Sequence, residues 1–134
     1  MTPKRLHMIT MGMMGEAGII GEENAGGMDL NGIVEYLGIN SMTTYNWRMA
    51  GIREDYIPWA EDGIALTNRW DAILEIPYFP VVSIGWDNTP RYGQFGKDQV
   101  VHRGNTPESC GAYLQQAKDY LDKRPGQTPV IMIN

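Results

Sequence analysis

The chain has 134 residues, of which 43% are hydrophobic and 20% are charged, and its formal net charge is −5. This length and composition indicate one globular domain and exclude a disordered or low-complexity chain. The eleven Lys and Arg residues are scattered along an acidic chain, which argues against nucleic acid as a partner, because phosphate binding needs clustered basic side chains.

The N-terminal part predicts one strand and a glycine-rich loop. The apolar run at 6–13 (LHMITMGM) follows basic residues, as in a signal peptide, but Gly15 and Glu16 end it and no clean cleavage pattern follows. No apolar run in the chain approaches the roughly 18 residues that a membrane span needs, so we expect no membrane partner. The loop after this strand lacks the glycine spacing and the lysine of nucleotide-binding loops, which favours a plain strand-to-helix connection.

Three further apolar runs lie at 38–47, 78–84 and 129–133. Each is short and almost continuously apolar, rather than alternating between apolar and polar residues. This pattern is typical of parallel strands that are buried on both faces. With the run at 6–13, they make four predicted strands.

Helical patterns occupy the intervals between these strands. Asp29 can cap a short helix at 30–37, which Gly38 would end. A longer helix is expected at 55–74, where apolar residues recur at helical spacing. A third helix is expected to begin at Thr106, because a hydroxyl cap, a proline and an acid follow one another there.

Strands and helices that alternate in this way form either an open doubly wound sheet or a closed (β/α)8 barrel. Neither a dinucleotide motif nor a Gly-Lys-Ser/Thr sequence is present, which disfavours the nucleotide-binding doubly wound folds. The sequence stops at Asn134, directly after an apolar run that needs a covering helix. We therefore predict an α/β fold in which residues 1–134 form a single partial (β/α)8 barrel domain, with about four parallel strands and a truncated C-terminal end.

Aromatic and polar side chains follow the predicted strands, and ligands bind at the carboxyl ends of parallel strands. Sugars offer apolar faces to aromatic rings, and hydroxyl groups to carboxylate, amide and guanidinium groups. The chain therefore predicts a site for a neutral, polyhydroxylated ligand. The candidate substrate-binding residues are Tyr45, Trp47, Trp86, Asp87, Asn88, Arg91 and Asn134.

The residues after the third strand also have structural interpretations. Trp86 can pack at the rim of a barrel, and its surface would then be unavailable to a sugar. Asp87 can cap the turn that follows it, or pair with Arg91 to hold this loop. Both interpretations of each residue stay open.

The other aromatic residues are more typical of packing. Tyr45 and Trp47 can belong to the core as readily as to a site. Trp59 and Trp70 fall on the apolar spacing of the second predicted helix, and we expect both to be packing residues.

No complete catalytic set or cofactor site is evident. His7 and His102 have no Cys or acidic partners at metal-ligand spacing, so neither a metal nor a cofactor is predicted. Cys110 is the only cysteine and is interpreted as a packing residue. Asp87 is the only acid at a predicted strand end, whereas glycoside hydrolysis usually needs two carboxyl groups.

The sequences PYFPVVSIGWDNTPR, TPE and PVIMIN resemble the C-terminal part of WbsX-type proteins, which are often labelled glycosyltransferases and are related to the glycoside hydrolase family 99 endo-mannosidases. The similarity is most specific at 78–134 and extends more loosely to LGINSMTTYNW. It implies a (β/α)8 barrel that acts on a polysaccharide or glycan. It also implies that the rim of the sugar site contains Trp86, Asp87, Asn88 and Arg91, with Tyr45 beside them.

In this family the last strand continues into an Asn-x-Trp-Asn-Glu-Trp stretch, whose glutamate is expected in catalysis or substrate binding. Asn134 corresponds to the first residue of that stretch. The expected function is therefore a fragment of a glycoside hydrolase family 99-like enzyme that is inactive alone. The alternatives are a glycosyltransferase of surface polysaccharide synthesis, or a non-catalytic carbohydrate-binding remnant that the rest of the barrel or a homo-oligomer completes.

Overall fold

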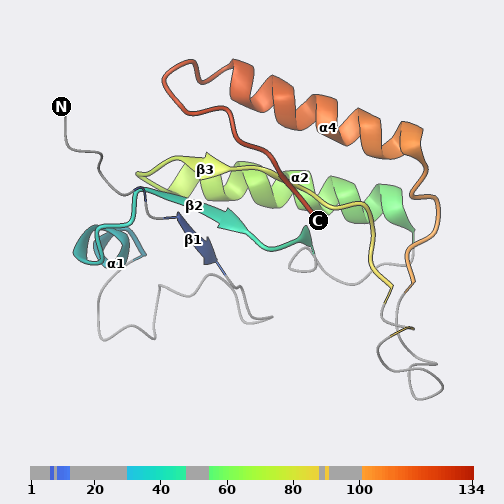
Figure 1. Cartoon of the computed structure of the whole chain (residues 1–134), viewed down its shortest axis with the longest axis horizontal. Helices are drawn as coiled ribbons and strands as arrows, with labels where there is room; N and C mark the ends of the chain where they lie inside the picture. The colour runs from blue at the N-terminus through green and yellow to red at the C-terminus, as the bar shows by residue number, and fades with distance from the viewer. Residues whose placement is uncertain (1–6, 8, 13–29, 48–54, 88–89, 91–100) are drawn as a thin grey trace.

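The computed structural model describes residues 7, 9–12, 30–47, 55–87, 90 and 101–134 (Figure 1). In these residues the chain is a mixed α/β structure in which helices follow short parallel strands. The elements in chain order are β1 (Ile9–Gly12), α1 (Leu30–Tyr36), β2 (Ser41–Thr44), α2 (Tyr56–Ile73), β3 (Tyr78–Phe79), β4 (Val81–Val82), α4 (Pro107–Asp122) and β5 (Met132–Ile133).

The strands pair in the order in which they occur along the chain. One sheet has the order β1-β2-β3 and a second pairs β4 with β5, and every pair in them is parallel. The predicted strand at 78–84 is thus observed as two short strands on either side of Pro80. Proline has no backbone N–H, but the Pro80 carbonyl still accepts a hydrogen bond from the Met132 N–H at 2.9 Å.

The extended run that contains β3 and β4 connects the two sheets. The Pro77 carbonyl accepts from the Met42 N–H of β2, whereas the Val82 carbonyl accepts from the N–H of Asn134 beyond β5. Successive residues of a strand direct their backbone groups to opposite sides, so this run has β2 on one side and β5 on the other. The described strands therefore follow one another in space as β1, β2, β3 with β4, and β5.

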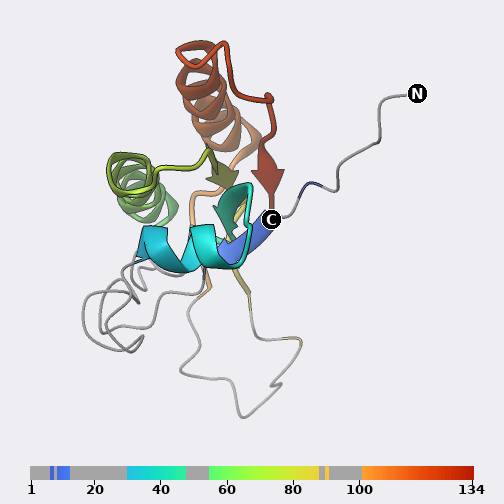
Figure 2. The same cartoon turned by 90° about the vertical axis from the view of Figure 1, so that its left-hand side faces the viewer.

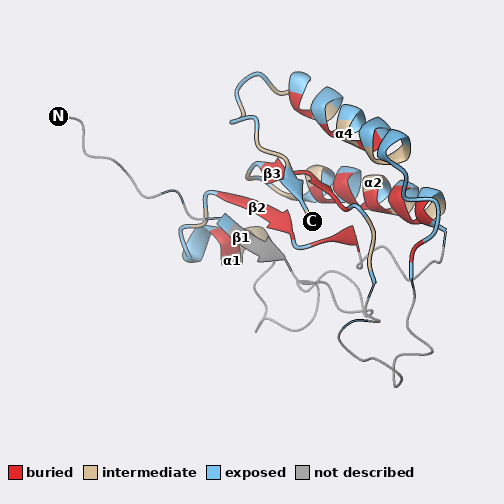
Figure 3. Ribbon diagram, turned by 45° about the vertical axis from the view of Figure 1, so that its right-hand side comes forward, coloured by how far each residue is buried: buried red, intermediate tan, exposed pale blue. Residues whose placement is uncertain are grey.

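Two clusters of buried side chains fix the helices against one face of these strands. Met42 and Tyr78 pack against Leu66 and Trp70 of α2, and Leu30 of α1 lies against the same cluster. The second cluster joins Val82 of β4 to α2 and α4, and its buried members are Trp47, Tyr56, Trp59, Ala60, Val82, Tyr113 and Ala117. Figure 2 shows α2 and α4 on the same side of the strands, and Figure 3 shows buried residues along β2 and α2.

The predicted helices are confirmed, with ends that differ by one or two residues. The Thr106 hydroxyl caps α4 by accepting a hydrogen bond from the Ser109 N–H at 3.2 Å. Gly38 follows α1 with φ +66°, and the Ile39 N–H reaches back to the Val34 carbonyl, as in a Schellman motif. The predicted cap Asp29 lies outside the described residues.

The predicted α/β class and the parallel strands are confirmed in the part of the chain that the structure describes. The strands are shorter than the apolar runs that predicted them, since only Ser41–Thr44 of the run at 38–47 is a strand. None of the described helices has the length and apolar character needed to cross a membrane.

Candidate functional site

Because the described strands are parallel, β2, β4 and β5 end at one edge, and the residues that follow them lie there together. We call this the carboxyl edge, defined by Tyr45, residues 84–87 and Asn134. Tyr45 comes directly after β2, and 54% of its surface is exposed. Trp86 is half-buried and Asp87 is exposed. Three of the predicted site residues therefore present surface at the same edge.

Backbone hydrogen bonds fix Asn134 at this edge. Its N–H donates to the Val82 carbonyl at 3.1 Å, and its own carbonyl accepts from the Ile84 N–H at 2.7 Å. Asn134 is half-buried and lies one strand away from the segment that leads to Trp86. The prediction that Asn134 belongs to the same edge as Trp86 agrees with this pairing.

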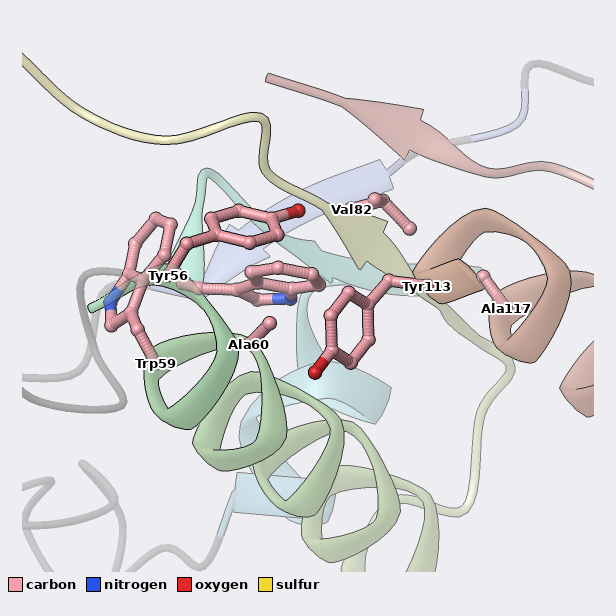
Figure 4. Close-up of a cluster of buried hydrophobic side chains, with 7 residues drawn as sticks. Tyr56, Trp59, Ala60, Val82, Tyr113 and Ala117 are labelled. Atoms are coloured by element: carbon pink, nitrogen blue, oxygen red, sulfur yellow. The ribbon is translucent and has the colours of Figure 1, made fainter. Parts of the chain in front are cut away.

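Trp47 lies in the core rather than at the surface. Its side chain is 1% exposed and makes edge-to-face contacts with Trp59 at 5.5 Å and with Tyr113 at 5.7 Å between ring centroids. Figure 4 shows Tyr56 and Trp59 at the start of α2, with Tyr113 lying between this helix and α4. The ring of Trp47 therefore has no free face for a sugar, and its position matches the packing interpretation. Trp59 and Trp70 are buried too, as expected.

Two predicted site residues, Asn88 and Arg91, lie outside the described residues, and so does the expected pairing of Arg91 with Asp87. Asp87 itself forms an antiparallel bridge with Val101. This bridge brings residues 101–103 alongside the segment that follows β4. The carboxyl edge is thereby supported by a part of the chain that the sequence did not connect with it.

His102 belongs to the segment that supports the carboxyl edge, and the sequence did not indicate it as a site residue. The Nδ1 atom of its side chain accepts a hydrogen bond from the backbone N–H of Trp86 at 2.8 Å. The backbone N–H of His102 donates to the Trp86 carbonyl at 3.2 Å. The imidazole stacks on the Trp59 indole, with ring centroids 3.9 Å apart and planes 23° apart. His102 is 8% exposed, and this burial lowers the pKa of its imidazole.

The turn that presents Trp86 depends on Gly85 and Asn105. Gly85 has φ +120°, a conformation that favours glycine. The Asn105 amide donates to the Ile84 carbonyl at 2.9 Å, and a Cβ atom on Gly85 would lie 2.7 Å from that amide nitrogen. The direction of the chain into Trp86 is therefore set by close packing of Asn105 over the glycine.

The buried tyrosine beneath the carboxyl edge is excluded from acid–base chemistry. The Tyr56 hydroxyl donates to the Ser83 carbonyl at 2.8 Å, and burial raises its pKa far above the ordinary value, so it stays protonated. Among the described residues, no group of three or more His, Cys, Asp or Glu side chains could hold a metal ion. Asp87 is the carboxylate that the described strands place at this edge.

A second polar cluster lies away from the carboxyl edge, where α2 and α4 meet. Arg124 forms an ion pair with Asp71, and the Tyr120 hydroxyl donates to the same carboxylate at 2.6 Å. The Arg124 guanidinium also lies 3.7 Å from the centroid of the Tyr120 ring. A cavity of about 310 Å³ adjoins Tyr120 and Arg124. Since these charges satisfy one another, the cluster is best explained as a clamp between the two helices.

Comparisons with protein-family models, with curated proteins and with solved structures gave no match for this chain. What the chain binds has to follow from its own residues and their positions.

Proposed function

We propose that this chain is a carbohydrate-binding part of a (β/α)8 barrel of the glycoside hydrolase family 99-like kind, and that its carboxyl edge binds a polysaccharide or glycan. The strand order supports a barrel, because the described strands follow one another in chain order and their helices pack on one face. A doubly wound sheet would reverse its strand order and place helices on both faces.

The observation that carries the proposal is the exposure of two aromatic residues at the carboxyl edge. Tyr45 is more than half exposed, and Trp86 is half-buried, whereas Trp47, Trp59 and Trp70 are all buried. Hydrophobic packing explains the three buried rings but not these two. An aromatic ring beside an exposed carboxylate matches the apolar face and the hydroxyl groups of a sugar.

Asp87 is suited to hydrogen bonding with sugar hydroxyls, and in a complete site it would also suit acid or base chemistry. Hydrolysis usually needs a second carboxyl group roughly 5–10 Å away. Asp55, which precedes α2 and bridges to Arg103 next to His102, is a second described carboxylate near this edge. Sugar binding without turnover is the second candidate, because the exposed rings can bind a sugar whether or not a second carboxyl group takes part. Transfer from a nucleotide sugar would additionally require a diphosphate site.

The test is binding of soluble polysaccharides and oligosaccharides, mannose-containing ones first, to the full chain by calorimetry and tryptophan fluorescence. Trp86 is the accessible indole, so acrylamide should quench it preferentially and bound sugar should protect it. Replacing Trp86→Ala should weaken binding about tenfold, which corresponds to the loss of one aromatic contact. Asp87→Ala should also weaken binding.

Tyr36→Ala is the matched control, because Tyr36 is 79% exposed but lies at the end of α1, away from the carboxyl edge. It should bind sugar as the wild type does. Equal affinity in the wild type, Trp86→Ala and Asp87→Ala would refute the site. Product analysis with and without nucleotide sugars then separates hydrolysis, transfer and simple binding.

A further inference from the structure

We propose that His102 is the positioning residue of Trp86, and that protonation of its Nδ1 releases Trp86 from the carboxyl edge. The sugar-binding consequence rests on the proposed function. The coupling between the two residues does not, because it follows from their contacts alone.

The first step is the hydrogen bond between them. A backbone N–H can only donate, so the Trp86 N–H requires a lone pair on His102 Nδ1, 2.8 Å away. The neutral imidazole must then carry its proton on Nε2. The second bond, from the His102 N–H to the Trp86 carbonyl, makes the contact reciprocal. Trp86 is therefore held through both of its backbone polar groups by one residue.

The second step is the anchor behind His102. The imidazole lies on the indole of Trp59, which is itself 1% exposed and packs against Trp47 and Tyr56. Tilting the imidazole out of its plane would break this stack. His102 thus connects the position of Trp86 to the buried aromatic cluster of α2.

The third step is what a proton does to this arrangement. In the imidazolium both ring nitrogens are donors, so an Nδ1–H would face the Trp86 N–H and the bond would be lost. Burial lowers the pKa of His102, and it outweighs an opposing effect of the Trp86 backbone. The folded chain therefore favours the neutral ring.

Other charged groups lie on the elements that surround the ring. Asp55 is the N-cap residue of α2, and Asp62 lies in the second turn of that helix. Arg103 follows His102, and Asp87 follows Trp86. Their carboxylates would attract a proton to the imidazole, whereas the Arg103 guanidinium would oppose it. Burial is nevertheless the largest influence on the pKa of His102, and it favours the neutral form.

The direction of the pH effect follows. The unfolded chain would take up the proton near the ordinary histidine value of about 6.5, and the folded chain only at lower pH. The contribution of this contact is complete above about pH 6.5 and is lost as the pH falls through the lowered value. Trp86 should therefore be held at neutral pH and released in acid.

The experiment measures hydrogen exchange of the Trp86 amide and acrylamide quenching in the full chain without sugar, from pH 8 down to the lowest pH at which the chain stays folded. The protection factor of this amide should fall about tenfold, as expected for the loss of one buried hydrogen bond. His102→Asn places a non-titrating acceptor near the position of Nδ1, so protection should persist and its pH dependence should disappear. His7→Asn, which removes the only other histidine, should keep the wild-type profile.

Three results would overturn the coupling. They are constant protection of Trp86 across this pH range, a wild-type profile in His102→Asn, and an Nδ1–H tautomer of wild-type His102 at pH 8 in ¹⁵N spectra. The last measurement needs no variant, so a His102→Asn chain that fails to fold leaves the test intact. Sugar affinity is measured separately over the same range. Absence of binding at every pH would refute the proposed function, while hydrogen exchange alone still decides the role of His102.

Discussion

The indole of Trp47 lies directly against Gly63 of α2, where a Cβ atom would come within 2.4 Å of Trp47 Cγ. A glycine in the middle of a helix ordinarily costs about 1 kcal/mol relative to alanine. Here the absence of a side chain lets the largest aromatic residue of the core approach the helix backbone.

Gly63→Ala should therefore destabilise the protein, by about 1–3 kcal/mol in urea unfolding, because overpacking outweighs the gain in helix propensity. The control is Gly111→Ala in α4, where a Cβ atom would meet nothing within 4 Å. That variant should gain about 0.5–1 kcal/mol. A stabilised Gly63→Ala chain would show that Trp47 does not lie on the helix in this way.

Asp71→Ala should lower the free energy of unfolding by about 1–2 kcal/mol, because it removes the partner of both Arg124 and Tyr120 where α2 meets α4. The two charged side chains are about 30% exposed, so part of this effect should disappear in high salt. Asp122→Ala breaks an exposed pair with Lys118 within α4, which solvent screens, and should cost much less than Asp71→Ala. Equal costs would contradict the clamp.

Gly85→Ala should disturb the carboxyl edge. Its φ of +120° is unfavourable for alanine, and the new methyl group would collide with Asn105. We expect a loss of about 1–3 kcal/mol in stability together with greater acrylamide quenching of Trp86. Gly126→Ala, where a Cβ atom would meet nothing within 4 Å, should change neither measurement. Unchanged quenching in Gly85→Ala would mean that this turn does not set the position of Trp86.

Thr106→Ala should remove the N-cap of α4 and cost about 1 kcal/mol in urea unfolding, whereas Thr106→Ser should retain most of the wild-type stability.

Backbone and Thr106 hydrogen bonds lower the pKa of Glu108 in the first turn of α4. A carboxyl with a lowered pKa stabilises the folded state above its unfolded value of about 4.5, and that contribution is lost as the pH falls through the folded value. The acid sensitivity should decrease in Glu108→Gln.

Local signals were sufficient to predict the helices. Thr106 caps the residues directly after it, and Gly38 closes α1 through bonds that reach back only five residues. The parallel strands could be predicted from their nearly continuous apolar character. The burial on both faces that this pattern implies is wrong for β5, because Met132 and Ile133 are exposed. The lengths of the strands could not be predicted, since these depend on partners elsewhere in the chain.

The candidate site was only partly predictable, for the same reason. Alternation of side chains stops where β2 ends at Thr44, so nothing local distinguishes exposed Tyr45 from buried Trp47 two residues later. His102 binds Trp86 across 16 residues and stacks on Trp59 of another element. No spacing rule connects these three residues, and only the folded chain brings them together.

The extended run at 78–82 hydrogen-bonds to β2 on one side and to β5 on the other, with the large aromatic cluster lying over it. Separation of either β2 or β5 from this run would expose aromatic side chains that also pack against the elements on the other side. Both flanks should therefore melt cooperatively, so that signals from α2 and α4 share one midpoint and the slowest-exchanging amides of the described chain fall on this run.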